Sequence, residues 1–190
     1  MAGHATLTVM LIIEEIKRPD GKKFVLLQFQ RDEILNDLDQ YGFVEGDVQR
    51  ADAPHLKEAR HQTQDITQDG NVDLVTRWLN LEHTRCRELL YPYSKIPVDC
   101  MTSLGDYLVD KDSYVIPLLV PDDFSQTTAE HLEEVIHNLM VWRVLWRWFG
   151  ITKPEAADKW LASAAECEDE IKGALARLCR GVRRPLRPFS

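Results

Sequence analysis

Hydrophobic residues gather near the N-terminus in two short runs, residues 7–16 and 22–30, with polar residues between them. Both runs are rich in Val, Ile, Leu and Phe, which strands favour. Between them lies Arg18-Pro19-Asp20-Gly21, and Pro followed by Asp-Gly is typical of a tight turn that ends in a left-handed glycine. The pattern predicts a β-hairpin over residues 1–30. Because an isolated two-stranded ribbon is only marginally stable, we expect it to pack on helices or to pair with another chain.

The next apolar residues recur at helical spacing over residues 31–41 and are followed by Gly42. Glycine is a frequent residue just past the end of a helix, so a short helix ending at Gly42 is predicted. Residues 43–70 then mix Gly, Asp, Gln and His with few large apolar residues, which is typical of a long loop. The apolar face of the short helix consists of Ile34, Leu35, Leu38 and Tyr41.

The first of three longer helical segments begins after Asn71, a favourable capping residue, and is predicted to end at Tyr91 because Pro92 follows. Its apolar stripe consists of Val72, Val75, Leu79, Cys86, Leu89 and Leu90. Beyond it, residues 114–120 form an apolar extended run that contains Pro117. Since proline cannot donate a ladder hydrogen bond, this run is predicted to be an edge strand or an extended wrap.

The second long helix is predicted to begin at the capping-box pattern Thr127-Thr-Ala-Glu130 and to stop at Gly150. Its apolar stripe consists of Leu132, Val135, Ile136, Leu139, Met140, Val144, Leu145 and Trp148. The third helix has Pro154 in its first turn and is predicted to end before Gly181. Its stripe consists of Trp160, Ala164, Cys167, Ile171, Ala174 or Leu175, and Leu178.

Together these patterns predict a mainly α fold: a bundle of three long helices near residues 71–91, 128–149 and 155–179, with an N-terminal β-hairpin and an extended basic C-terminal arm. A chain of 190 residues with 44% hydrophobic content is large enough for one core. The expected organisation is a hairpin at 1–30, a short helix and loop at 31–70, a helical domain at 71–180 and the arm at 181–190.

Charge is unevenly distributed along the chain, whose net charge is -8. Residues 1–170 hold 17 Lys and Arg against 31 Asp and Glu, whereas residues 171–190 hold six basic residues and no acid. An acidic body with a basic arm suits a protein that docks on an acidic partner, on phosphate, or on neighbouring copies of itself. The candidate partner-binding residues of this segment are Arg177, Arg180, Arg183, Arg184, Arg187 and Phe189.

A second candidate for partner binding lies in the second long helix, where Arg143 and Arg147 are interleaved with Trp142, Trp146, Trp148 and Phe149. Such a mixture can stack on nucleic-acid bases. The preferred interpretation is that the indoles pack the bundle, and that an indole on the opposite face contributes to a subunit contact, because Trp and Arg are enriched at interfaces. Trp142 and Trp146 are therefore added to the partner-binding candidates.

The sequence contains no pattern typical of an active site. It has no Gly-x-Ser-x-Gly elbow, no phosphate loop and no dinucleotide fingerprint. Its four cysteines have no CxxC spacing, which predicts reduced thiols rather than a disulfide or metal framework. We therefore expect a noncatalytic protein with no cofactor and no metal.

The histidines have polar neighbours that invite a comparison with metal sites. His83 and Cys86 lie three residues apart, but no second pair at zinc spacing accompanies them, so a surface histidine beside a core cysteine is the simpler interpretation. His131 and His137 are six apart and fall on different helix faces. A loop site built from His55, His61 and Asp65 is conceivable, although solvated loop polarity explains it more simply.

The longest apolar runs are far shorter than the roughly 20 residues that a membrane-spanning helix needs. The N-terminal Met-Ala-Gly-His-Ala-Thr lacks the basic region of a secretory signal. We expect a soluble protein that stays in the cytoplasm and does not bind a membrane.

The helical region resembles the head-tail connector (adaptor) proteins of tailed bacteriophages and Mu-like prophages. The resemblance covers residues 69–190. It is carried by the segment Tyr91-Pro-Tyr-Ser-Lys-Ile-Pro97 after the first helix, a second crossing helix, and Ile151-Thr-Lys-Pro154 before the third. It implies a structural subunit, found in the bacterial cytoplasm during assembly and in the virion, that forms a ring with copies of itself between portal and tail proteins. The N-terminal hairpin and the 43–70 loop depart from the family pattern.

Two other functions remain open. The arginine segment suits a nucleic-acid-binding regulator, but an acidic body repels DNA and a short arm offers few phosphate contacts, so nucleic acid is an unlikely partner. A small hydrolase with its site at the loop histidines ranks last.

Overall fold

The computed structural model describes residues 22–48, 64–95 and 111–178, and most of these residues are helical. The predicted mainly α fold is confirmed. In chain order the elements are β1 (Lys22–Gln30), α2 (Arg31–Val48), the short 3-10 helix η1 (Asp65–Thr67), α4 (Val72–Leu89), α5 (Tyr91–Ser94), β2 (Ser113–Pro121), α6 (Gln126–Thr152) and α7 (Pro154–Leu178).

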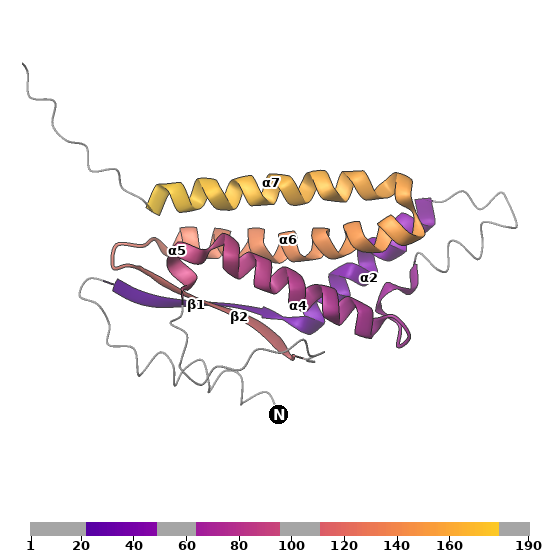
Figure 1. Ribbon diagram of the computed structural model, residues 1–190, viewed down its shortest axis with the longest axis horizontal. Coiled ribbons are helices and arrows are strands. Elements are labelled where there is room, and N and C mark those ends of the chain that lie inside the picture. The colour runs from indigo at the N-terminus through magenta and orange to yellow at the C-terminus, as the bar shows by residue number, and fades with distance from the viewer. Residues whose placement is uncertain (1–21, 49–63, 96–110, 179–190) are drawn as a thin grey trace, which may run out of the picture.

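The central helix of the fold is α6. It contacts α7 along one side and α4, α2 and β1 on the others, and α7 forms the outer layer farthest from the strands (Figure 1). The stripe predicted for α6 is buried throughout, and Val141 and Phe149 are buried as well. Because a helix that is apolar on most sides is stable only when it is covered on most sides, the sequence of α6 explains its central place.

The two strands form an antiparallel pair in which Lys22 lies opposite Pro121 and Gln30 opposite Ser113. Alternate residues of β2 face the core, and those residues are Tyr114, Ile116, Leu118 and Val120. The strand predicted at 114–120 is confirmed, with Pro117 opposite Leu26 in a two-stranded sheet. The first strand and the turn of the predicted hairpin lie outside the described residues, and the partner that the structure gives β1 is β2.

Two glycines that were predicted to end helices lie inside them. α2 continues through Gly42 to Val48, so the prediction of a loop from residue 43 is wrong for its first six residues. α6 continues through Gly150 to Thr152, and the Lys153 N–H donates to the Phe149 carbonyl at 2.8 Å. In both places tertiary contacts beyond the glycine outweigh the helix-ending preference of the residue.

The predicted helix starts are also corrected in part. α6 begins at Gln126, and the amides of Thr128 and Ala129 donate to the Ser125 carbonyl, so the capping box at Thr127 is wrong. Glu130, its fourth residue, instead accepts a hydrogen bond from the Gln126 side chain at 2.8 Å.

Asn71 precedes α4 as predicted, but its side chain donates to the Asp65 carbonyl at 2.8 Å rather than capping the helix. α4 ends at Leu89, and Pro92 lies in the first turn of the short helix α5. Pro154 begins α7 as predicted. Of the helices in the three described ranges, none is long and apolar enough to span a membrane.

Candidate partner-binding site

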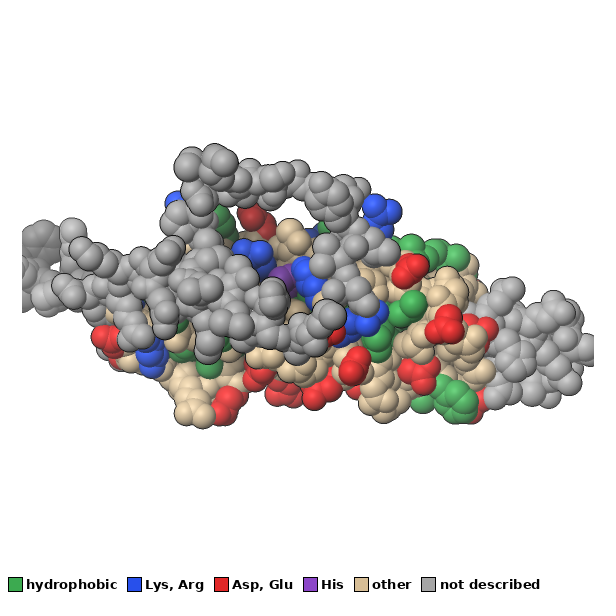
Figure 2. All heavy atoms as spheres, turned by 90° about the horizontal axis from the view of Figure 1, so that it is seen from below, with side chains coloured by type: hydrophobic (Ala, Val, Ile, Leu, Met, Phe, Trp, Pro, Cys, Tyr) green, Lys and Arg blue, Asp and Glu red, His purple; other side chains and the backbone are tan. Residues whose placement is uncertain are grey.

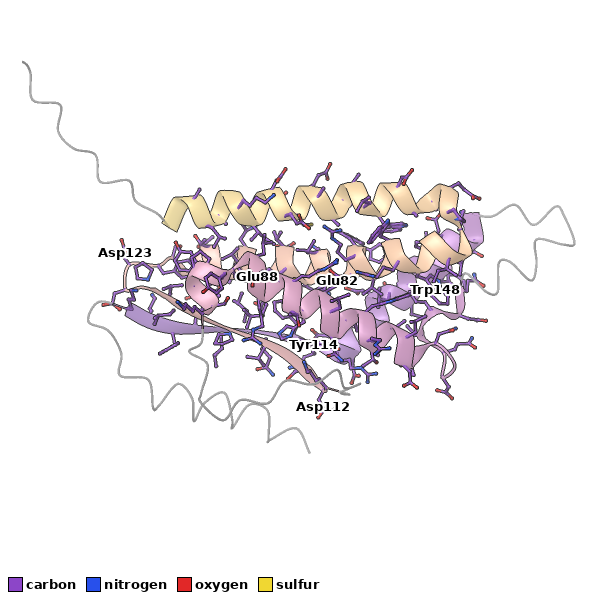
Figure 3. The ribbon with its side chains drawn as sticks, in the orientation of Figure 1. Glu82, Glu88, Asp112, Tyr114, Asp123 and Trp148 are labelled. Carbon is purple, nitrogen blue, oxygen red and sulfur yellow. The ribbon has the colours of Figure 1, made fainter. Side chains whose placement is uncertain are left out.

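Trp142 lies where α2, α6 and α7 meet. Its half-buried ring packs edge-on against Tyr41 of α2, with the ring centroids 4.9 Å apart, and lies 5.2 Å from the ring of Trp160 on α7. Trp160 in turn stacks on Phe149 at 5.7 Å. The prediction that the indoles pack the bundle is therefore confirmed at Trp142, and also at the buried Trp148 (Figure 3).

Trp146 is half-buried one turn after Trp142 on α6, and its ring lies close to two guanidinium groups. The central carbons of Arg143 and Arg147 are 5.9 and 5.5 Å from the ring centroid. Each arginine also has a carboxylate partner on another helix, Glu168 of α7 and Glu82 of α4 respectively. The alternation of indoles and arginines in the sequence therefore serves contacts inside the fold.

The most deeply buried of these charges is Glu82, whose side chain is 2% exposed. It accepts hydrogen bonds from Nε and Nη2 of Arg147 at 3.1 and 2.9 Å, and from Arg85 at 3.1 Å. Glu82 lies between α4 and α6 in Figure 3. With Arg143 and Glu168, these residues form a line of opposite charges across α4, α6 and α7, which we call the carboxylate–arginine seam.

A pocket of about 570 Å³ opens beside the seam, between the same three helices. Apolar side chains alternate with charged ones around it. The lining residues are Glu82, Arg85, Cys86, Glu88, Leu89, Leu139, Arg143 and Glu168. Such a pocket suits a side chain with an apolar stem and a charged end.

Cys86 lies in this pocket but is poorly suited to nucleophilic chemistry. Burial, with the nearby carboxylates of Glu82 and Glu168, raises the pKa of the thiol to about 12. The thiol is therefore protonated near neutral pH, whereas the thiolate is the reactive form. Cys86 and Cys167 are both free thiols, as predicted, and Cys100 and Cys179 lie outside the described residues.

His83 is buried, so the prediction of a surface histidine is wrong, while the core position of Cys86 is confirmed. The Nε2 atom of His83 is 3.1 Å from the Val115 carbonyl oxygen, and its ring lies 5.3 Å from the ring of Tyr114. Burial lowers the pKa of His83 to about 4, helped by the charges of Lys111 and Arg87. His83 contacts β2 through this side of α4. It follows the apolar stripe residue Leu79 by four residues, and this spacing in the sequence indicates a buried position for His83.

His131 and His137 were predicted to lie on different faces of their helix, and the structure confirms this. His137 is 2.9 Å from a carboxylate oxygen of Asp37 on α2, whereas His131 faces Glu170 of α7 at 4.0 Å, as expected for different helix faces. His55 and His61 lie outside the described residues. Asp65 accepts a hydrogen bond from Gln68 at 2.6 Å. Within the part of the chain that the structure describes, no cluster of three or more His, Cys, Asp or Glu is suited to a metal ion.

The basic candidates fall at the edge of the described chain. The backbone of Arg177 belongs to the last turn of α7. The others, Arg180, Arg183, Arg184, Arg187 and Phe189, lie outside the described residues.

Sequence reasoning missed that Phe43 and Val44 are exposed apolar residues of a helix, α2. Ile151, near the end of α6, is exposed as well. The ends of α2 and α6 lie close together, because Nζ of Lys153 is 2.7 Å from a carboxylate oxygen of Glu45. The sequence predicts a loop for Phe43 and Val44, so it contains no signal for this approach.

Comparison of the chain with protein-family models, with curated proteins and with solved structures gave no match. A function for this chain therefore has to be inferred from its own residues and geometry.

Proposed function

We propose that this protein is a noncatalytic structural subunit of a phage or prophage particle, a head-tail connector that assembles as a ring on a portal protein. The observation that carries the proposal is the order of α4, α5, α6 and α7: a long helix, a short Tyr-Pro-Tyr-Ser turn of helix, a central crossing helix, and a last helix that starts directly at Pro154. This is the order expected from the resemblance to connector proteins.

The exposed surfaces of α6 and α7 also fit a ring. A ring of identical subunits needs two different complementary patches on each chain. Exposed acidic residues lie on the first half of α6 and the second half of α7, and they are Glu130, Glu133, Glu134, Glu166, Asp169 and Glu170. The arginine-rich segment that follows α7 has the opposite charge, so contacts between neighbouring copies through these two patches are electrostatically favourable.

The test is co-expression and copurification with a candidate portal protein. We expect a stable complex that shows ring-shaped particles in negative-stain electron microscopy. Changing Arg183, Arg184 and Arg187 together to Ser should weaken the complex while leaving the melting temperature of the isolated protein nearly unchanged. The control variant, Lys22→Ser with Lys95→Ser, removes exposed cations elsewhere and should assemble normally.

The same variants distinguish this proposal from a DNA-binding regulator. A regulator would bind duplex DNA with an affinity that falls steeply with salt, and the triple Ser variant would lose that binding. We expect negligible duplex binding at physiological salt, because the acidic body opposes the attraction of the arm. A tight, salt-sensitive complex with DNA, together with no association with the portal, would contradict the connector proposal.

A further inference from the structure

Two cationic side chains flank the buried His83 on the side of α4 that faces β2. The Lys111 Nζ atom lies 5.5 Å from the centroid of the Tyr114 ring, and the ring of His83 lies 5.3 Å from the same Tyr114 ring. Arg87 follows His83 by four residues, so both side chains lie on one face of α4. In Figure 2, blue Lys and Arg side chains lie on both sides of a purple histidine side chain.

No acidic side chain neutralises these two cations in the part of the chain that the structure describes. The ion pairs of α4 and β2 there include neither Arg87 nor Lys111. The Nε atom of Arg87 is buried and has no hydrogen-bond acceptor. Both residues are themselves half-buried. A buried donor of this kind is normally satisfied by a partner, and no described residue accepts from this one, so it can donate to a bound anion.

The positive charges of Arg87 and Lys111 repel each other. Burial lowers the pKa of Lys111, and the positive charge of Arg87 lowers it further. Holding two like charges together at a half-buried site is unfavourable, and a bound anion would remove that cost. The feature is local, since the chain as a whole carries a net charge of -8.

We infer that Arg87 and Lys111 form a binding site for a phosphate dianion. Two positive charges balance a dianion, whereas a single carboxylate would leave one of them uncompensated. The planar fork of an arginine donates two parallel hydrogen bonds to phosphate oxygens, and a lysine adds a compact charge. The phosphate is that of a small molecule rather than of a nucleic acid, because the net charge of -8 on the chain repels a polyanion.

Thermal unfolding at pH 7.5 tests the site, with phosphate titrated against sodium chloride at constant ionic strength. The wild-type melting temperature should rise with phosphate and reach saturation. Lys111→Gln should bind phosphate about tenfold more weakly or worse, because a hydrogen bond to a charged group is lost. The matched control is Lys95→Gln, which removes an exposed lysine that lies over the Tyr91 ring instead, and it should respond as wild type does.

A second measurement separates binding from a structural role. In chloride alone, Lys111→Gln should be as stable as wild type or more stable, because a like-charge repulsion is removed.

The site is refuted if wild type shows no saturable response to phosphate, if Lys95→Gln and Lys111→Gln respond equally, or if Lys111→Gln is destabilised in chloride. A fluorescent single-stranded oligonucleotide covers the other source of phosphate. Tight binding of the oligonucleotide that inorganic phosphate displaces would overturn the assignment to a small molecule. None of these results depends on portal assembly, because every measurement uses the isolated protein.

Discussion

Glu82 of α4 receives both Nε and Nη2 of Arg147 from α6, at 3.1 and 2.9 Å, while its side chain is 2% exposed. Both hydrogen bonds end on the same oxygen, Oε1 of Glu82, and this charge-assisted pair ties α4 to α6. A buried carboxylate needs such partners, because its desolvation is otherwise unfavourable by several kcal/mol.

Removing the Glu82 charge should therefore destabilise the protein strongly. Glu82→Ala leaves the Arg147 guanidinium without its partner, and we expect a loss of about 2–4 kcal/mol in the free energy of unfolding. Urea denaturation measures it. Glu88→Ala, an exposed glutamate on the same helix, is the matched control and should change stability by less than about 0.5 kcal/mol. Equal losses for the two variants would contradict a stabilising role for the pair.

Leu139 tests the core at the middle of α6. It is 4% exposed and lines the pocket together with Cys86 and Leu89 of α4. Leu139→Ala should lower the free energy of unfolding by about 2–5 kcal/mol, with the smaller figure if the adjacent pocket lets neighbours relax. Ile151→Ala removes an aliphatic side chain that is 66% exposed and should have little effect. A loss below about 0.5 kcal/mol for Leu139→Ala would show that this face is not part of the core.

His83 should make stability depend on pH between neutrality and pH 4. Its pKa is lowered from 6.5 to about 4 by burial, by Lys111 and by Arg87. The unfolded chain therefore takes up a proton near pH 6.5 while the folded chain does not, and stability falls as pH decreases across this window. The loss should total roughly 3 kcal/mol. Urea denaturation at pH 7, 6 and 5 should show that the free energy of unfolding falls less steeply with decreasing pH for His83→Gln than for wild type.

Glu45 should make stability depend on pH in a more acidic range than His83 does. Burial alone would raise its pKa, but hydrogen bonds from Lys153 and Lys159 outweigh burial and lower it from 4.5. A carboxyl group with a lowered pKa contributes stability above its unfolded value, and that contribution is lost as the pH falls through the folded value. Glu45→Gln should therefore be less stable than wild type at pH 7, and the difference should shrink below pH 4.5. Thermal melts at pH 7 and pH 3 would disprove this if the difference stayed constant.

The helical core could be predicted from the sequence because its signal is periodic and local. The buried residues of α6 and the α7 residues Trp160, Ala164, Ile171 and Ala174 are the stripes expected from spacing alone. The positions at which the helices end were harder to predict. Gly42 and Gly150 are typical terminators, yet each helix continues past them, and the extension of α2 brings Glu45 to Lys153. A contact between residues that far apart leaves no trace in local propensity.

The same limit applies to the sites. His83 was predicted at the surface beside a core cysteine. The spacing of the α4 stripe indicates that it faces inward, but the groups it meets there, the Val115 carbonyl and the Tyr114 ring, come from β2. Gly46 shows another such approach: a Cβ atom there would lie 2.6 Å from Cγ of Gln64. In the sequence nothing links Glu82 to Arg143 and Arg147. Their interactions depend on the packing of α4, α6 and α7. The seam and the pocket thus arise from tertiary packing and could not be predicted residue by residue.

The connection between α6 and α7 has a consequence for how the chain folds. Only Lys153 separates the two helices, and they then pack along their lengths, whereas β1 and β2 pair residue 22 with residue 121. Contacts between segments close in sequence require little loop closure and form fast, while distant pairings form late. The α6–α7 hairpin is therefore the natural nucleus, onto which α4 and then the two strands add. During synthesis both strands are made before α7, so their apolar residues stay uncovered until the α6–α7 hairpin has formed.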